Sequence, residues 1–103
     1  MGNKLSISII TPTFNRADEL DCLLRSISKQ TYPLKNIEFI VSDDGSHDKT
    51  EKVVNKWQKK SLFDLIYIRQ ENKGPGAARN HGLEKCKGDI ILFIDSDCEA
   101  HPK

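Results

Sequence analysis

The sequence predicts an α/β fold in which a Rossmann-like, mostly parallel sheet is flanked by helices. Four apolar runs alternate along the chain with three segments whose apolar residues recur at helical spacing. Strands and helices that alternate over short linkers form right-handed βαβ units, and therefore parallel sheets. In the doubly wound arrangement the four strands take the spatial order 3-2-1-4, so the first strand lies between the second and the fourth.

The first strand and the first helix are the most clearly patterned elements. The strand is expected from Leu5 to Thr11, because its isoleucines are too dense for a half-exposed strand. Pro12 is expected to end it, since proline cannot donate a hydrogen bond to a ladder. The helix is expected from Ala17 to about Gln30, where four apolar residues fall at positions i, i+3, i+4 and i+7.

The rest of the chain continues this alternation. Asp48 and Glu51 have the spacing of a capping box, which predicts the start of the second helix. Gly88 is suited to close the third helix. The remaining elements are expected as a strand over Ile37 to Ser42, a helix from about Asp48, a strand over Leu65 to Arg69, a helix from Ala77 to about Cys86, and a strand over Asp89 to Ile94.

The composition indicates one soluble globular domain of 103 residues, with 37% hydrophobic and 30% charged residues. A formal net charge of +1 argues against a nucleic-acid partner. No apolar stretch reaches the roughly 18 residues that a membrane-spanning helix needs. The odd count of three cysteines, without a CxxC pair, favours a reducing and hence cytoplasmic environment.

Polar residues lie at the carboxyl ends of the first, second and fourth strands. They are Thr11, the turn Asp43-Asp44-Gly45-Ser46, and Asp95-Ser96-Asp97. Because the carboxyl ends of these strands meet at the switch point of a doubly wound sheet, the clusters are expected to converge. Aspartate, glycine and serine are also ordinary turn residues. Two adjacent aspartates at a strand end nevertheless need partners that stabilise both charges, so the convergence predicts a ligand site at this edge.

The Asp95-x-Asp97 pair directly follows the apolar run Ile91 to Ile94. Two hard oxygen ligands at the open end of a buried strand suit a divalent cation that keeps waters and holds phosphates. Asp97 is expected to bind the cation directly, and Asp95 to bind one of its waters or a ribose. Such a cation neutralises a diphosphate leaving group. An isolated Asp-x-Asp pair also occurs by chance in acidic loops, so the prediction depends on its position after the strand.

The run Gly74-Pro75-Gly76-Ala77-Ala78-Arg79 does not form a dinucleotide fingerprint. Arg79 replaces the third glycine, and the run follows the third strand rather than the first. The run still leads into a helix N-terminus, which is a natural place for an anion. Lys73 and Arg79 either meet a phosphate there or are simply solvated, and the sequence favours neither interpretation.

Read together, three stretches resemble the family 2 glycosyltransferases of the GT-A fold. They are SIITPTFNRADELDCLLRSISKQTYP, IEFIVSDDGSHDKT and ENKGPGAARNHGLEKCKGDIILFIDSD, in this order and with family-like spacing. The resemblance covers nearly the whole chain. It implies an inverting enzyme that moves a sugar from a nucleotide donor, commonly a UDP-sugar, to an acceptor hydroxyl.

The resemblance also implies roles for single residues. Thr11 and Pro12 correspond to the floor of the nucleotide pocket, and Asp44 to the carboxylate that meets the base. The whole set that it implies is Thr11, Pro12, Arg16, Asp43, Asp44, Arg79 and Asp95 for the nucleotide, with Asp97 and Asp95 as ligands of Mn²⁺ or Mg²⁺.

The length of the chain limits what the resemblance implies for it. Residues 1–103 correspond to a single, N-terminal, donor-binding part of a truncated GT-A domain. The acceptor-binding half and the general base are expected beyond Lys103, so the chain alone is expected to bind the nucleotide without catalysing transfer. The expected partners are a UDP-sugar and, in a full-length cytoplasmic or membrane-associated enzyme, an acceptor sugar or lipid-linked glycan. A sheet cut after its fourth strand is also expected to expose an edge through which two copies pair.

Three alternatives compete with this interpretation. A nucleotidyltransferase usually carries a glycine-rich basic loop after its first strand, where this chain has Thr11 to Arg16 without a glycine. A receiver-type phosphoacceptor domain needs an aspartate at the end of its third strand, where this chain has Arg69 and Gln70. A non-catalytic nucleotide-binding or assembly module remains open, because the residues discussed so far bind rather than catalyse.

Overall fold

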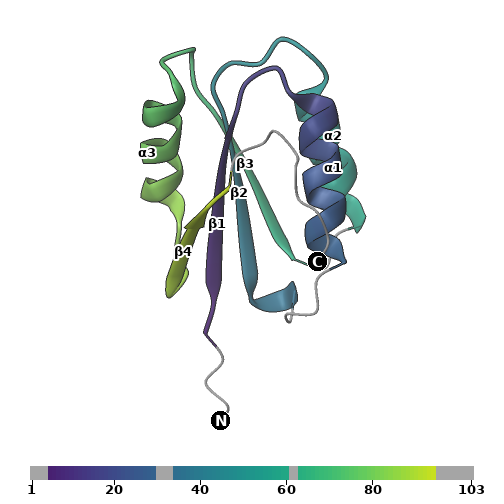
Figure 1. Cartoon of the computed structure of the whole chain (residues 1–103), viewed down its shortest axis with the longest axis vertical. Helices are drawn as coiled ribbons and strands as arrows, with labels where there is room; N and C mark the ends of the chain where they lie inside the picture. The colour runs from purple at the N-terminus through teal and green to yellow at the C-terminus, as the bar shows by residue number, and fades with distance from the viewer. Residues whose placement is uncertain (1–4, 30–33, 61–62, 95–103) are drawn as a thin grey trace.

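Four parallel strands form one sheet in the order β3-β2-β1-β4, which confirms the predicted fold class and strand order. The computed structural model describes residues 5–29, 34–60 and 63–94 (Figure 1). Its elements are β1 (Ile7–Thr13), α1 (Ala17–Ser28), a short 3-10 helix η1 (Leu34–Asn36), β2 (Ile37–Asp43), α2 (Thr50–Lys60), β3 (Asp64–Arg69), α3 (Pro75–Lys85) and β4 (Ile90–Phe93).

Helices cover both faces of the sheet, with α1 and α2 on one face and α3 on the other (Figure 1). The main core fills the space between the sheet and the α1–α2 layer, and its fully buried centre includes Leu20, Leu23, Leu24, Phe39, Val41 and Val54. On the opposite face, the Ser42 hydroxyl donates to the Ala78 carbonyl at 2.6 Å. Alternate residues of β1 and β2 therefore face different helices, as the pleat of a strand requires.

The prediction that Pro12 ends the first strand was wrong, because β1 continues to Thr13. The carbonyl of Ile10 accepts a hydrogen bond from the Ile94 N–H at 3.1 Å, so Ile10 directs its backbone groups toward β4. Because backbone groups alternate along a strand, the backbone nitrogen of Pro12 also points toward β4. The β1–β4 ladder ends with the pair Ile10 and Phe93, so the missing N–H of Pro12 removes no ladder hydrogen bond.

Two helix starts also differ in detail from the predictions. The Asp48 carboxylate caps α2 by accepting the N–H of Thr50, two residues further along the chain, at 3.0 Å. The predicted capping box would instead have paired Asp48 with Glu51, three residues further. The third helix begins at Pro75, two residues earlier than expected. Proline is well suited to a first helical turn, since its missing N–H has no partner there in any case.

The strand β4 lies at the edge of the sheet, with β1 as its neighbour. Its four residues, Ile90, Ile91, Leu92 and Phe93, are each 39% to 48% exposed although all are apolar. Strands of parallel sheets are normally covered on both faces, so β4 presents an apolar surface on both. None of the helices in the described parts of the chain has the length and hydropathy that crossing a bilayer requires.

Candidate functional site

The loops that follow β1 and β2 are joined by hydrogen bonds at the carboxyl edge of the sheet. The backbone N–H of Asn15 donates to the Ser46 hydroxyl at 2.8 Å, and the Asn15 side-chain oxygen accepts the His47 N–H at 2.7 Å. The Ala17 N–H at the start of α1 donates to the Asp48 carboxylate at 3.1 Å. Asn15 has a φ of 52°, which asparagine tolerates better than most residues. The two loops therefore form one connected rim.

Asp43 lies at the end of β2 and is only 1% exposed. Its carboxylate accepts the Ser46 N–H at 2.9 Å and the hydroxyl of Tyr67 on β3. The Arg69 guanidinium lies 4.0 Å away. Burial, followed by the hydrogen bond to Asp43, raises the pKa of the Tyr67 hydroxyl, so this tyrosine stays protonated as a donor. Asp43 thus joins its own turn to the neighbouring strand.

Asp44 follows directly and is 4% exposed. Its carboxylate accepts three hydrogen bonds from the β3–α3 loop: from the Gln70 side-chain amide at 2.9 Å, the Lys73 N–H at 2.7 Å and the Gly74 N–H at 2.9 Å. Burial alone would raise the pKa of this carboxyl group, but the three hydrogen bonds together lower it below the ordinary value of 3.8. Asp44 is therefore held as a carboxylate.

The two adjacent aspartates face opposite sides of the sheet. Thr13 is paired with Asp43 in the ladder, and both lie on the α1–α2 side, as does Thr11 two residues earlier. Pro12 and Asp44 lie on the α3 side. Thr11 and Thr13 are 0% and 4% exposed, and their hydroxyls have no hydrogen-bond partner among the described residues. The predicted polar clusters do converge at one edge, but their side chains are divided between its two faces.

The remaining predicted residues are placed less completely. Arg16 is exposed at the start of α1, where its carbonyl accepts the Leu20 N–H, and Arg79 is half-buried on α3. Asp95 and Asp97 lie outside the described residues. Within residues 5–29, 34–60 and 63–94, no group of three or more His, Cys, Asp or Glu side chains is arranged to hold a metal ion. The predicted cation site therefore stays a prediction.

Sequence reasoning missed the partners that hold the two aspartates. The sequence pattern places Tyr67 in a strand and the loop before α3 at a possible phosphate site, but it does not indicate that either one reaches an aspartate. The glycine at position 45 is the one feature of the sequence that indicates this packing, because it adopts a φ of +90°, at which glycine is favoured. A Cβ atom there would lie 3.2 Å from the Asn72 nitrogen and the Gln70 oxygen. Such a close approach indicates that another loop packs against the turn.

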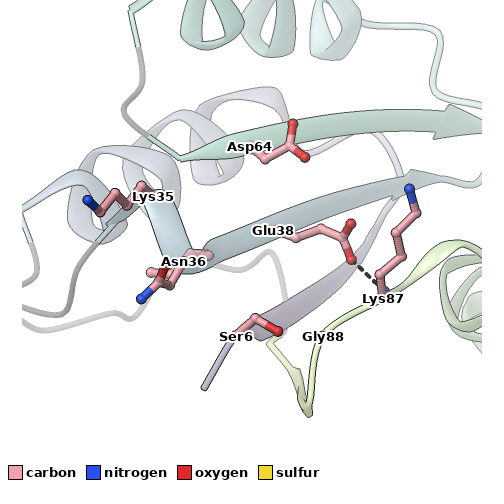
Figure 2. A pocket seen from close by; sticks show the side chains of 8 residues that line it. Ser6, Lys35, Asn36, Glu38, Asp64, Lys87 and Gly88 are labelled. Carbon is pink, nitrogen blue, oxygen red and sulfur yellow. Dashed lines mark hydrogen bonds between the residues drawn. The ribbon is translucent and has the colours of Figure 1, made fainter. Parts of the chain in front are cut away.

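A pocket of about 200 Å³ lies at the opposite, amino edge of the sheet (Figure 2). Glu38 is at its centre, where the carboxylate accepts the Ser8 hydroxyl at 2.7 Å and the Lys87 N–H at 2.8 Å. The residues that line it are Ser6, Lys35, Asn36, Ile37, Glu38, Asp64, Lys87 and Gly88. None of them belongs to the predicted polar clusters, so this pocket is separate from the candidate site.

Comparison with known proteins points to glycosyl transfer. Residues 8–103 match the family model described as "Glycosyl transferase family 2". The chain is 36% identical over 97 residues to "Glycosyltransferase AglE" of Haloferax volcanii. This alignment covers 92% of this chain and 31% of that protein. It is 39% identical over 94 residues to "GalNAc(5)-diNAcBac-PP-undecaprenol beta-1,3-glucosyltransferase" of Campylobacter jejuni, over 90% of this chain and 30% of that protein. The chain thus spans about a third of the length of these relatives.

Two solved structures share the fold. Staphylococcus aureus TarS 1-349 in complex with UDP superposes with a TM-score of 0.83 at 36% identity, over 90% of this chain and 28% of that one. The mannosyltransferase PcManGT of Pyrobaculum calidifontis, in complex with GDP-Man and Mn²⁺, superposes with a TM-score of 0.87 at 27% identity, over 98% of this chain and 30% of that one. The likeness to these enzymes confirms the predicted GT-A type of sheet.

Proposed function

Because this chain belongs to glycosyl transferase family 2, we propose that it forms the donor-binding part of an inverting glycosyltransferase. One observation carries the proposal. The loops after β1 and β2 are joined by hydrogen bonds at Asn15, and Asp44 joins the turn after β2 to the loop after β3, all at the carboxyl edge of the sheet. Ligands of open α/β sheets bind at this edge, where the strand order reverses. A preformed rim of this kind lowers the cost of ordering loops when a ligand binds.

The proposed donor is a UDP-sugar. Support comes from the similarity to TarS, whose solved complexes hold UDP and UDP-GlcNAc and which is 36% identical to this chain; PcManGT, whose complex holds GDP-Man, is 27% identical. Pro12 and Arg79 lie on the α3 side of the sheet, at its carboxyl edge. On this same side, Asp44 is hydrogen bonded to the loop before α3. The proposed nucleotide site comprises Thr11, Pro12, Arg16, Asp43, Asp44, Arg79 and Asp95.

A divalent cation, Mn²⁺ or Mg²⁺, is proposed at Asp97 and Asp95. The donor set fits such an ion, because carboxylate oxygens are the ligands that hard divalent cations prefer. Ile94, which precedes Asp95 in the sequence, is hydrogen bonded to Ile10 close to Pro12. Two related structures contain Mn²⁺ together with a nucleotide. When bound, the cation supplies charge neutralisation for the diphosphate leaving group.

The acceptor and the catalytic base are proposed to come from outside residues 1–103. Inversion by direct displacement needs a base on the face opposite the leaving group, and the two aspartates at the end of β2 are not free for that role. Asp43 and Asp44 are both buried and hydrogen bonded. We therefore propose that this chain binds the donor without transferring the sugar, and that a cytoplasmic full-length enzyme uses an acceptor sugar or a lipid-linked glycan.

Calorimetric titration of UDP into the chain, with and without Mn²⁺, tests the proposal. The unsubstituted chain is expected to bind UDP more tightly with Mn²⁺. Asp97→Ala is expected to lose at least about tenfold in affinity, the size of loss common around metal sites, and to lose the dependence on Mn²⁺. Asp64→Ala is the matched control, because Asp64 is exposed at the amino end of β3. No binding by a chain shown to be folded, or equal losses in both variants, contradicts the proposal.

We further propose that two copies pair through β4. The N–H groups of Ile90 and Ile94 bond to β1, so by alternation Ile91 and Phe93 direct their backbone groups away from β1, to a side where no strand among the described residues pairs with β4. An open apolar edge strand is a template for a second strand. Sedimentation is expected to show a concentration-dependent dimer that Phe93→Lys converts to monomer. A chain that stays monomeric at all concentrations rules the pairing out.

A further inference from the structure

We propose that a polar clamp at the amino edge of the sheet fixes the register of β4, and that Glu38 is thereby a positioning residue for the proposed cation site. The clamp consists of Ser6, Ser8, Glu38 and residues 87–89. The role given to Glu38 rests on the proposed function, because the run Asp95-Ser96-Asp97 follows directly on the segment that the clamp aligns.

The side chains of β4 do not determine its register by themselves. A register is strongly specified where one face of a strand is buried, because a shift of one residue moves the apolar side chains to the wrong face. All four residues of β4 are apolar and each is 39% to 48% exposed, and the apolar run continues at Ile94. A shift would therefore replace one apolar side chain by another on either face. Other contacts have to select the observed pairing of Ile10 with Phe93.

The residues just before β4 make such contacts with β1 and β2. The Gly88 N–H donates to the Ser8 hydroxyl at 2.7 Å, and this hydroxyl donates to the Glu38 carboxylate at 2.7 Å. The same carboxylate oxygen accepts the Lys87 N–H at 2.8 Å, as Figure 2 shows. One oxygen of Glu38 thus joins the segment that leads into β4 to the two central strands.

A second pair of residues extends the clamp at the start of β1. The N–H and the hydroxyl of Ser6 donate to the Asp89 carboxylate at 3.1 and 3.2 Å, and the Asp89 N–H donates to the Ser6 carbonyl at 2.9 Å. These side-chain bonds are exposed and compete with water. Ser8 is 0% exposed and Glu38 is half-buried, so the inner bonds of the clamp are the more costly ones to break.

A shift of β4 by one residue is incompatible with this clamp. A Cβ atom on Gly88 would lie 2.6 Å from both the nitrogen and the hydroxyl of Ser8, so neither Lys87 nor Asp89 fits in its place. The shift would also leave the Ser8 hydroxyl without its donor, and a buried group that loses its partner costs more than the bond contributes. The same shift would turn every following side chain to the opposite face and move it about 3.3 Å along the strand. The clamp therefore determines where the chain leaves β4.

Glu38→Ala tests the proposal, because it removes the acceptor of both the Ser8 hydroxyl and the Lys87 N–H. Hydrogen exchange is measured at a dilution where sedimentation shows monomers, so that no second copy covers the open edge of β4. The N–H groups of Ile90 and Ile94 bond to β1 and are expected to exchange slowly in the unsubstituted chain. In Glu38→Ala their exchange is expected to rise about tenfold, while exchange in α1 stays unchanged.

Binding of the metal separates positioning from stability. The affinity of folded Glu38→Ala for Mn²⁺ in the presence of UDP is expected to fall about tenfold, as when groups that orient metal ligands are removed. Its affinity for UDP without Mn²⁺ is expected to stay unchanged. Asp64→Ala is the matched control, because Asp64 lines the same pocket but is exposed on β3 (Figure 2), and it is expected to alter neither affinity. Glu38→Gln keeps an oxygen that can accept both hydrogen bonds and is expected to retain most of the Mn²⁺ affinity.

Four results overturn the proposal. They are unchanged exchange at Ile90 and Ile94 in Glu38→Ala, an unchanged Mn²⁺ affinity where that exchange has risen, an equal loss of Mn²⁺ affinity in Asp64→Ala, and a Glu38→Gln chain that behaves like Glu38→Ala. If Glu38→Ala does not fold, Ser8→Ala decides by the same readouts, because it removes the hydroxyl between Gly88 and Glu38. Failure of the proposed function would appear separately, as absence of Mn²⁺-dependent UDP binding by the unsubstituted chain. The exchange at Ile90 and Ile94 would then still decide whether the clamp holds β4.

Discussion

Gly88→Ala is expected to lower the free energy of unfolding by about 3 kcal/mol, the upper end of what overpacking usually costs. A Cβ atom on Gly88 would lie 2.6 Å from both the nitrogen and the hydroxyl of Ser8, and 2.9 Å from the carbonyl carbon of Ile7. The colliding atoms include backbone of β1, which is paired on both sides and cannot shift alone. The Gly88 N–H also donates to the Ser8 hydroxyl at 2.7 Å. Urea unfolding of both proteins measures the difference.

Gly76→Ala is the matched control. A Cβ atom on Gly76, in the first turn of α3, meets nothing within 4 Å. Alanine is the better helix former by about 1 kcal/mol, so this variant is expected to be as stable as the unsubstituted chain or slightly more stable. Equal stabilities for Gly88→Ala and Gly76→Ala would show that the segment between α3 and β4 does not approach β1 as closely as described.

The strand order and the edge of the sheet that carries the site can be predicted from the sequence, because they depend on the hydrophobic patterns of individual segments. Runs such as Phe39 to Val41 place apolar residues at consecutive positions, which is typical of a strand covered on both faces. When a helix connects two such strands, the strands are normally parallel and the connection is right-handed. The continuation of β1 through Pro12 could not be predicted in the same way. It depends on where β4 ends, which is a relation between segments about 80 residues apart.

The same limit applies to the site. The sequence shows that Asp43 and Asp44 end a strand, and strand periodicity already implies that neighbours face opposite sides. Their partners depend on three-dimensional positions. Tyr67 reaches Asp43 because β2 and β3 pair in a particular register, and the loop at Lys73 reaches Asp44 because Gly45 lets it approach. Asp95 and Asp97 remain predictions from sequence and resemblance.

Phe39→Ala is expected to cost about 4 kcal/mol of stability, the range found when a buried phenylalanine is truncated. Phe39 is fully buried in the middle of β2, and its ring lies 5.9 Å from that of Phe63. The strand around it is fixed by ladders on both sides, so the cavity cannot collapse easily. Since domains of this kind are stable by only about 5 to 15 kcal/mol, a large share of the native population is expected to be lost at moderate urea concentrations.

Phe14→Ala removes the same atoms from a residue that is 41% exposed in the loop after β1, and it is expected to change stability by less than about 1 kcal/mol. Equal losses in the two variants would mean that the core does not lie where the structure places it. Because β2 leads directly into Asp43 and Asp44, the cavity at Phe39 also separates stability from binding. Under conditions where Phe39→Ala remains folded, its UDP affinity is expected to match that of the unsubstituted chain, since the hydrogen-bonded rim at the carboxyl edge is untouched. A loss of affinity in the folded variant would show that the donor site depends on core packing as well as on its own loops.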